Sequence, residues 1–145
     1  MIVPDVNLLL YASDEESPFF EDAKHWWESS LSGGEEVGLT HPVLFAFLRI
    51  STSARVFREP LTLVEAGDRI KSWLDRSTTR ILLPGSTHEN QVIILLQAAG
   101  SSGGNLVTDA QIAELALASG GVVHTADHDF LRFPKLKTRF PLDKT

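Results

Sequence analysis

The sequence of 145 residues contains no cysteine. This excludes a disulfide framework, a thiol nucleophile and a zinc site built on cysteine ligands. Long hydrophobic runs are missing too. The longest unbroken aliphatic run extends from Val92 to Leu96, whereas a membrane-spanning helix needs about 20 apolar residues. The amino end shows neither a basic segment nor a small-residue cleavage site. We therefore expect a soluble, cytoplasmic protein.

Positive charge is scarce, and the formal net charge is -6. An acidic balance argues against bulk attraction to nucleic acid. It does not exclude a nuclease, because carboxylates that bind divalent cations count as negative charges in a sequence. The motifs GxGxxG, GxxxxGK[ST], GxSxG and HExxH are absent as well. Their absence argues against Rossmann dehydrogenases, P-loop nucleotidases, α/β-hydrolases and zincins.

Short apolar runs alternate with longer helical segments along the chain. We expect strands at residues 2–4, 37–39, 81–83, 122–124 and 136–137. Helices of about ten residues or more between such strands require crossover connections, which place helices on both faces of a mostly parallel sheet. A chain of this length fits one domain. The sequence therefore predicts a single three-layer α/β domain over residues 1–145, with a mostly parallel central sheet flanked by helices.

Capping patterns predict where several helices begin. Ser17-Pro18 predicts a helix that runs to about Leu31. An apolar helix is expected over residues 43–53. Three further helices are predicted by capping boxes at residues 62–65, 86–89 and 108–111. The last box puts Asp109 at the first helical position, where the helix dipole would lower the pKa of its carboxyl group.

Acidic residues stand where the predicted strands end. Asp5 follows the first strand, and both Asp127 and Asp129 follow the strand over 122–124. Together with Asp109 they meet on one rim, because ligand sites of open parallel sheets lie outside the carboxyl ends of the strands. Gathered carboxylates repel one another, so either some are protonated or a cation lies among them. Oxygen ligands select Mg²⁺ or Mn²⁺, and such ions point to phosphoryl chemistry.

Each polar residue of this rim also has an ordinary explanation. The three later acids, taken singly, suit a helix start and turns. Asp5 differs, because its neighbours in MIVPDVNLLLYA are apolar and an ionised carboxylate is costly to remove from water. Asn7 either supports Asp5 or a metal-bound water, or forms a local turn. Thr125 either bonds a phosphate or a carboxylate, or closes its own turn.

Three segments resemble the PIN-domain ribonucleases, and among them the VapC-type toxins of bacterial toxin–antitoxin pairs. They are Asp5-Val-Asn7, the run DAQIAELA that begins at Asp109, and the run TADHDF that begins at Thr125. The segment PVLFAFLRISTSARVF, from Pro42, is similar to the helix after the second strand in actinobacterial VapC-type proteins. The resemblance covers essentially the whole chain.

The resemblance implies a Mg²⁺-dependent endoribonuclease that forms a homodimer and cleaves RNA. A small cognate antitoxin would hold it inactive by covering the acidic pocket, often with an Arg-bearing segment. By position, Asp5, Asp109 and Asp127 match metal-binding acids, Asp129 is the expected fourth, and Asn7 and Thr125 match supporting polar residues. Attack by a metal-activated water would leave 5′-phosphate and 3′-hydroxyl ends.

One position departs from the family pattern. The family usually has a Glu three residues before the Arg of FAFLR, and this chain has Ala46. The substitution weakens the case for a full two-metal site and leaves open a degenerate PIN domain that only binds RNA or a partner. A haloacid-dehalogenase-like phosphatase is a further alternative, but it would need a second Asp where Asn7 stands.

Overall fold

A five-stranded sheet forms the centre of the computed structural model, which describes residues 1–144. All strand pairs are parallel, in the order β3-β2-β1-β4-β5. The strands are β1 (Ile2–Pro4), β2 (Val37–Thr40), β3 (Thr79–Leu82), β4 (Val122–His124) and β5 (Thr138–Arg139). The predicted α/β class with a parallel central sheet is confirmed.

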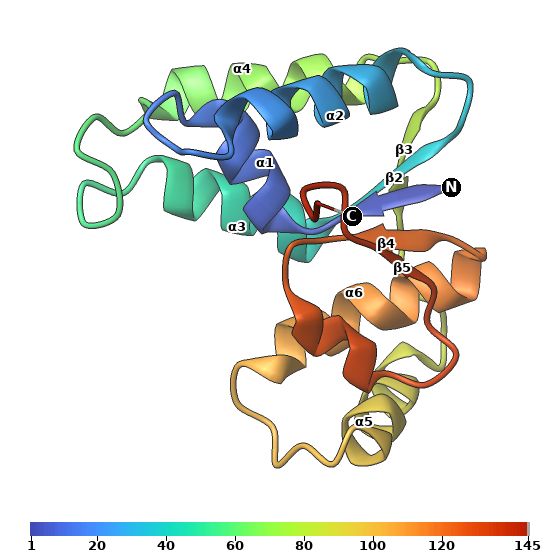
Figure 1. Cartoon of the computed structure of the whole chain (residues 1–145). Helices are drawn as coiled ribbons and strands as arrows, with labels where there is room; N and C mark the ends of the chain where they lie inside the picture. Colours follow the sequence, from blue (N-terminus) through green and yellow to red (C-terminus); the bar gives the residue numbers. More distant parts are fainter. Residues whose placement is uncertain (145) are drawn as a thin grey trace.

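Helices cover both faces of this sheet. They are α1 (Val6–Ser13), α2 (Phe20–Ser32), α3 (His41–Ser51), α4 (Leu63–Leu74), α5 (His88–Ala98) and α6 (Leu106–Ser119), followed by the 3-10 helix η1 (His128–Arg132). Figure 1 shows α1, α2 and α4 on one side of the strands and α5 and α6 on the other. These layers form because parallel strands need crossover helices, which must bury their apolar sides on the sheet. No helix of residues 1–144 has the length and apolar character needed to cross a membrane.

Aromatic side chains fill the layer between the sheet and the first group of helices. Trp73 of α4 meets Trp27 of α2 edge-on at 5.5 Å between ring centroids, and it meets the fully buried Phe47 of α3 at 4.8 Å. Edge-on packing is favourable for aromatic rings beyond the area that it buries. These contacts join α2, α3 and α4 to one another.

The predicted helix starts have different outcomes. Thr62 caps α4 in a complete capping box, as predicted. The boxes at 86–89 and 108–111 are wrong, because Thr87 and Asn105 occupy the cap positions of α5 and α6 without a side-chain bond. Both caps have ψ close to the helical or bridge range, at 10° and -21°, whereas a capping side chain reaches the helix amides from an extended backbone. The prediction at Ser17 is also wrong: α2 begins at Phe20.

Three elements of the chain differ from the prediction. No helix is predicted before Ser17, but the apolar run after Asp5 forms α1 and buries Leu8 and Leu9. The strand β3 begins at residue 79 instead of 81, and β5 lies at 138–139 instead of 136–137. Strand pairing decides these limits, since Thr79 pairs with Val37 and Thr138 pairs with Val123.

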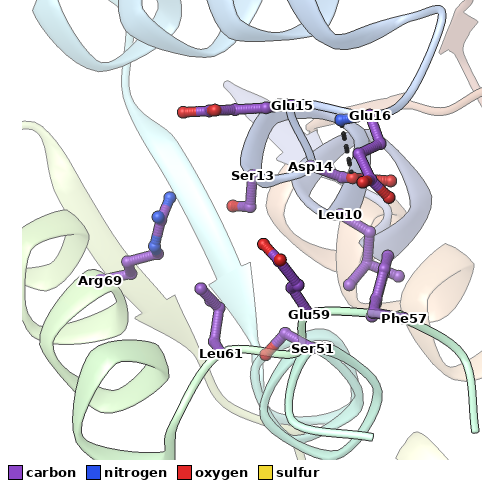
Figure 2. Close-up of a pocket in the computed structure, with 10 residues that line it drawn as sticks. All are labelled: Leu10, Ser13, Asp14, Glu15, Glu16, Ser51, Phe57, Glu59, Leu61 and Arg69. Atoms are coloured by element: carbon purple, nitrogen blue, oxygen red, sulfur yellow. Dashed lines mark hydrogen bonds between the residues drawn. The ribbon is translucent and has the colours of Figure 1, made fainter. Parts of the chain in front are cut away.

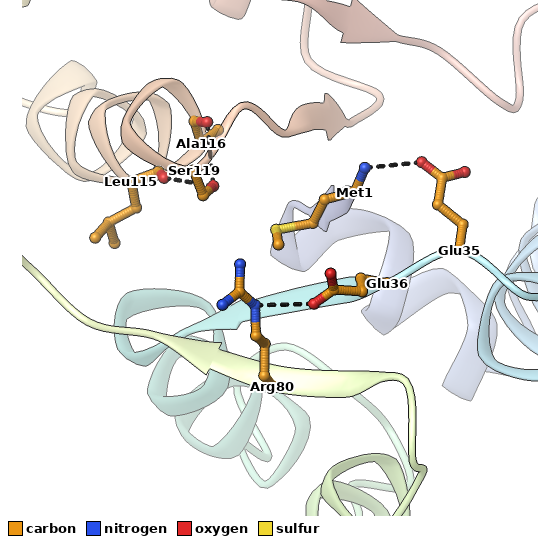
Figure 3. A network of polar contacts seen from close by, with 7 residues as sticks. All are labelled: Met1, Glu35, Glu36, Arg80, Leu115, Ala116 and Ser119. Atoms are coloured by element: carbon orange, nitrogen blue, oxygen red, sulfur yellow. Dashed lines mark hydrogen bonds and ion pairs between the residues drawn. The ribbon is translucent and has the colours of Figure 1, made fainter.

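At the amino edge of the sheet, opposite charges are paired. The amino group of Met1 donates to Glu35 Oε2 at 2.9 Å, and Arg80 Nε lies 3.1 Å from Glu36 Oε2 (Figure 3). The backbone is tight here, since a Cβ on Gly121 would lie 2.7 Å from Val3 Cγ2. The amino edge is therefore closed by ion pairs and close packing.

Candidate active site

The opposite, carboxyl edge of the sheet carries the predicted acids. Asp5 caps α1 directly after β1, and Asp127 caps η1 after β4. Asp109 comes from the first turns of α6, and Asp129 lies in η1. The charges of the other three acids all act on the carboxyl group of Asp109. The structure thus brings together four carboxylates that are up to 124 positions apart in the sequence, the separation of Asp5 and Asp129.

Asp5 is buried, with 4% of its surface exposed. Its Oδ1 accepts a hydrogen bond from Val6 N at 2.8 Å, and its Oδ2 accepts one from Thr125 Oγ1 at 2.7 Å. Burial raises the pKa of Asp5, the bonds from Thr125 and Val6 lower it, and the charge of Asp127 raises it again. The net direction is upward. Fixed on both oxygens, this carboxylate has a set position and little hydration.

Thr125 links Asp5 to the next acid. Its hydroxyl donates to Asp5 and accepts a hydrogen bond from Asp127 N at 2.9 Å, while the residue itself is fully buried. Asp127 Oδ1 in turn accepts a hydrogen bond from Asp129 N at 2.9 Å. Asn7 takes part from the other side: its Oδ1 accepts a long hydrogen bond of 3.4 Å from Ala126 N. Asn7 is therefore hydrogen-bonded to the loop that carries Asp127, and among residues 1–144 it forms no hydrogen bond with the Asp5 carboxylate.

The carboxyl group of Asp109 also has a raised pKa. Its pKa rises from 3.8 to about 7, mainly through burial and then through the charges of Asp5, Asp127 and Asp129. The lowered pKa predicted for it is wrong. Asp109 is the fourth residue of α6, not the first, and the influence of the dipole is confined to the end of a helix and weaker than burial beside three carboxylates.

An open hollow of about 580 Å³ lies over these acids. Asp109, Asp127 and Asp129 line it together with Arg132 and the loop at 100–103. Arg132 donates to Ala99 O at 3.0 Å, so its guanidinium is bound to the backbone at the end of α5, directly before that loop. Three acids against one arginine leave the hollow negative, which suits a cationic ligand.

The donor set fits a hard divalent cation by its chemistry. It consists of carboxylate oxygens, which Mg²⁺ and Mn²⁺ prefer, and the raised pKa of Asp109 shows that its charged form lacks compensation. Within residues 1–144, however, no three His, Asp or Glu side chains are already arranged so that they could hold an ion. Binding of a cation would therefore require these mutually repelling carboxylates to move toward the ion.

Sequence reasoning did not single out Thr40, the last residue of β2. Its hydroxyl is fully buried and, among the residues described, has no hydrogen-bond partner. Ile2 pairs with Val37 and Pro4 with His124, so the same registers place Asp5 level with Thr40 on one side and Thr125 on the other. The sequence offered one signal for Thr40: it directly follows the predicted strand over residues 37–39, and that strand lies beside the strand that precedes Asp5.

Ala46 lies in α3 and is half-buried.

Comparisons with known proteins show the family to which this chain belongs. The family model described as PIN domain matches residues 2–136. Ribonuclease VapC33 of Mycobacterium tuberculosis is 39% identical over 142 residues, which cover 98% of this chain and 99% of the relative. Among solved structures, VapBC-1 of nontypeable Haemophilus influenzae has a TM-score of 0.68 at 18% identity, covering 99% of this chain and 100% of that one. Mycobacterium tuberculosis VapC20, described as a sarcin-ricin loop cleaving toxin, has a TM-score of 0.68 at 17% identity and covers 94% and 99%.

Proposed function

Because the chain belongs to the PIN-domain family and is similar along its length to VapC ribonucleases, we propose that it is a metal-dependent endoribonuclease toxin of a VapBC-type pair. The observation that carries the proposal is the position of Asp5. A buried carboxylate held on both oxygens, beside three further acids, has no structural role that an uncharged residue would not fill at lower cost.

The residues that would hold Mg²⁺ or Mn²⁺ are Asp5, Asp109 and Asp127, with Asp129 as the fourth. A bound ion would supply the positive charge that activates water and stabilises the leaving oxygen in phosphodiester hydrolysis. Thr125 keeps the Asp5 carboxylate and the amide of Asp127 in fixed positions, whereas the other carboxylates would have to move toward the ion. We expect products with 5′-phosphate and 3′-hydroxyl ends.

The substrate and partners belong to the same proposal. RNA enters at the hollow over the acids, where Arg132 is the cation available to a phosphate oxygen. A cognate antitoxin is supported by the similarity to VapBC structures, and we expect the toxin to be a homodimer. Light scattering of the chain alone and with the product of the neighbouring reading frame tests both assemblies.

Two observations favour a second function. Ala46 stands where the family usually has a Glu, and no ready metal cluster exists among residues 1–144. A degenerate domain that binds RNA without cleaving it would show both features. The phosphatase alternative lacks such support, because Asn7 stands at the position of its second acid and contacts Ala126 N.

Cleavage of a labelled RNA with Mg²⁺, Mn²⁺ or EDTA distinguishes these functions. We expect cleavage with either metal, none with EDTA, and a loss of at least about 100-fold in Asp5→Asn. The matched control is Asp68→Asn, which removes an exposed acid of α4. Equal cleavage by Asp5→Asn and the control, or products with 2′,3′-cyclic phosphates, would contradict the proposal. RNA binding without cleavage would establish the degenerate domain.

A further inference from the structure

A second hollow, of about 300 Å³, lies at the end of α1 that is remote from Asp5. Figure 2 shows it between the end of α1, the end of α3, the segment 57–61 and Arg69 of α4. Asp5 precedes α1 and Asp14 follows it, so the eight residues of the helix separate this hollow from the acid rim by about 12 Å. It is a different site from the candidate active site.

Negative charge predominates in this hollow. Four acids line it against one base: Asp14, Glu15, Glu16 and Glu59 against Arg69. Glu16 forms an ion pair with Arg58 at 2.7 Å, but within residues 1–144 neither Glu15 nor Glu59 has a cation within 4 Å. In Figure 2 the carboxylate of Glu59 points into the middle of the hollow. A cationic group placed there meets uncompensated carboxylates.

A buried hydroxyl group adds an independent observation. Ser51, the last residue of α3, is 3% exposed and lines the hollow, and its Oγ has no hydrogen-bond partner among the residues described. Leaving a buried polar group without a partner costs about 1–3 kcal/mol. The backbone is already engaged, since Leu61 N donates to Ser51 O at 2.9 Å. Ser51 lines the hollow but its Oγ is covered, so a group that enters the hollow supplies the missing partner when the side chain turns toward it.

The remaining wall is apolar. Leu10 of α1 lines it together with Phe57 and Leu61 of the segment between α3 and α4. A metal ion gains nothing from contact with apolar side chains, whereas the methylene groups of a long cationic side chain pack well on an apolar surface. The combination of carboxylates, one free hydroxyl and an apolar wall is selective for an amphipathic cation.

We propose that this hollow binds a guanidinium or primary ammonium group carried on a short aliphatic chain. The cationic head lies between Glu59 and Glu15 and bonds to Ser51 Oγ, and the stem packs on Leu10 and Phe57. Two sources offer this chemistry: a free small amine, or an arginine or lysine side chain of a partner protein. The inference does not depend on nuclease activity, because none of its residues belongs to the acid rim.

Titration of the full chain, followed by amide chemical shifts and calorimetry, tests the site. Agmatine represents the free amine, and an Arg-containing peptide with blocked ends represents the protein side chain. We expect shifts at the amides of Ser51 and Glu59 and an affinity that falls about 5-fold or more in Glu59→Gln. Ser51→Ala should weaken binding about 3- to 10-fold. Glu28→Gln, an exposed acid of α2, is the matched control and should bind like the parent chain.

The outcomes separate the two sources and can overturn the site. Binding of agmatine alone indicates a small amine, and binding of the peptide alone indicates a protein partner. Three results contradict the proposal: no binding of either probe at about 10 mM, equal binding of the neutral isostere pentylurea, or equal loss in Glu59→Gln and Glu28→Gln. Shifts of the same amides by Mg²⁺ alone would identify an inorganic cation site instead and would also overturn it.

Discussion

The two edges of the central sheet treat acidic residues in opposite ways. At the amino edge, Glu35 accepts a hydrogen bond from the Met1 amino group, which lowers the pKa of the Glu35 carboxyl. At the carboxyl edge, Asp5 is buried with its pKa raised, and the pKa of Asp109 reaches about 7. The same parallel strands thus end in paired charges on one side and in mutually repelling charges on the other.

Charges at the two edges differ in their effect on the stability of the fold. Paired charges near water are compatible with stability and contribute little to it. Carboxylates that raise one another's pKa reduce stability at neutral pH, so they persist where a function requires them. A bound cation would reverse that balance at the carboxyl edge and change nothing at the amino edge.

Asp109→Asn should have the largest effect, at the carboxyl edge. We expect RNA cleavage to fall at least about 100-fold. Stability should change too. Between the ordinary pKa of 3.8 and the folded value of about 7, the folded chain binds more protons than the unfolded chain, so stability falls as the pH rises through that window. The variant lacks this pH-dependent loss. Between pH 4.5 and pH 8 its free energy of unfolding should therefore rise by about 1–2 kcal/mol relative to that of the parent chain, a figure that allows for solvent screening.

Urea unfolding in EDTA at several pH values measures this gain. The comparison with the parent chain cancels the opposite contribution of His124, whose pKa is lowered to about 4 by burial first and by the Arg139 charge second. Asp68→Asn serves as the control again. Parallel pH profiles for the parent chain and Asp109→Asn would show that the acids of the rim do not repel one another.

The sequence predicted the layers of the fold and the rim of acids for a physical reason. Strand alternation and strand ends are local patterns, and in a parallel sheet they place Asp5, Asp127 and Asp129 on one edge. The residues at which helices begin were harder to predict. Thr108 has the side chain of a cap, but α6 starts earlier at Leu106, because packing of the whole helix outweighs one capping bond. The resulting shift places Asp109 inside the helix and reverses the expected direction of its pKa.

The orphan hydroxyl of Thr40 and the hollow at Ser51 depend on tertiary contacts. Whether a hydroxyl finds a partner is decided by side chains far away in sequence, as for Thr125 and Asp5, which are 120 positions apart. No local pattern distinguishes Thr125, whose hydroxyl has a partner, from Thr40, whose hydroxyl has none among residues 1–144. Only the structure therefore shows which of the two threonine hydroxyl groups has a hydrogen-bond partner.

Gly121→Ala should give the largest change of stability at the amino edge. A Cβ at this position would lie 2.7 Å from Val3 Cγ2 in a fully buried strand, so the backbone or β1 must shift. We expect a loss of about 1–3 kcal/mol in the free energy of unfolding, measured by urea titration. Gly34→Ala is the control, because no atom lies within 4 Å of its added Cβ. Equal stability of both variants would mean that the amino edge is not tightly packed.

Thr40→Val tests the carboxyl edge on a smaller scale. The change removes a buried hydroxyl without a partner and keeps the shape of the side chain, so stability should rise by about 1 kcal/mol. Thr125→Val is the matched comparison: it deprives Asp5 of a hydrogen bond of 2.7 Å and should lower stability. Thermal melts of both variants, in EDTA, decide between them. A loss of stability in Thr40→Val would show that its hydroxyl has a partner in solution.

The ion pair of Glu36 and Arg80 should have the smallest effect. Both side chains are more than half exposed, at 57% and 55%, so water screens their attraction. A double-mutant cycle with Glu36→Gln and Arg80→Gln should give a coupling free energy below about 1 kcal/mol that vanishes in about 1 M salt. A larger, salt-resistant coupling would show that the amino edge, like the carboxyl edge, holds charges away from water. The two edges would then differ only in the sign of the charge that lies beside each carboxylate, because their charged groups would be equally shielded from water.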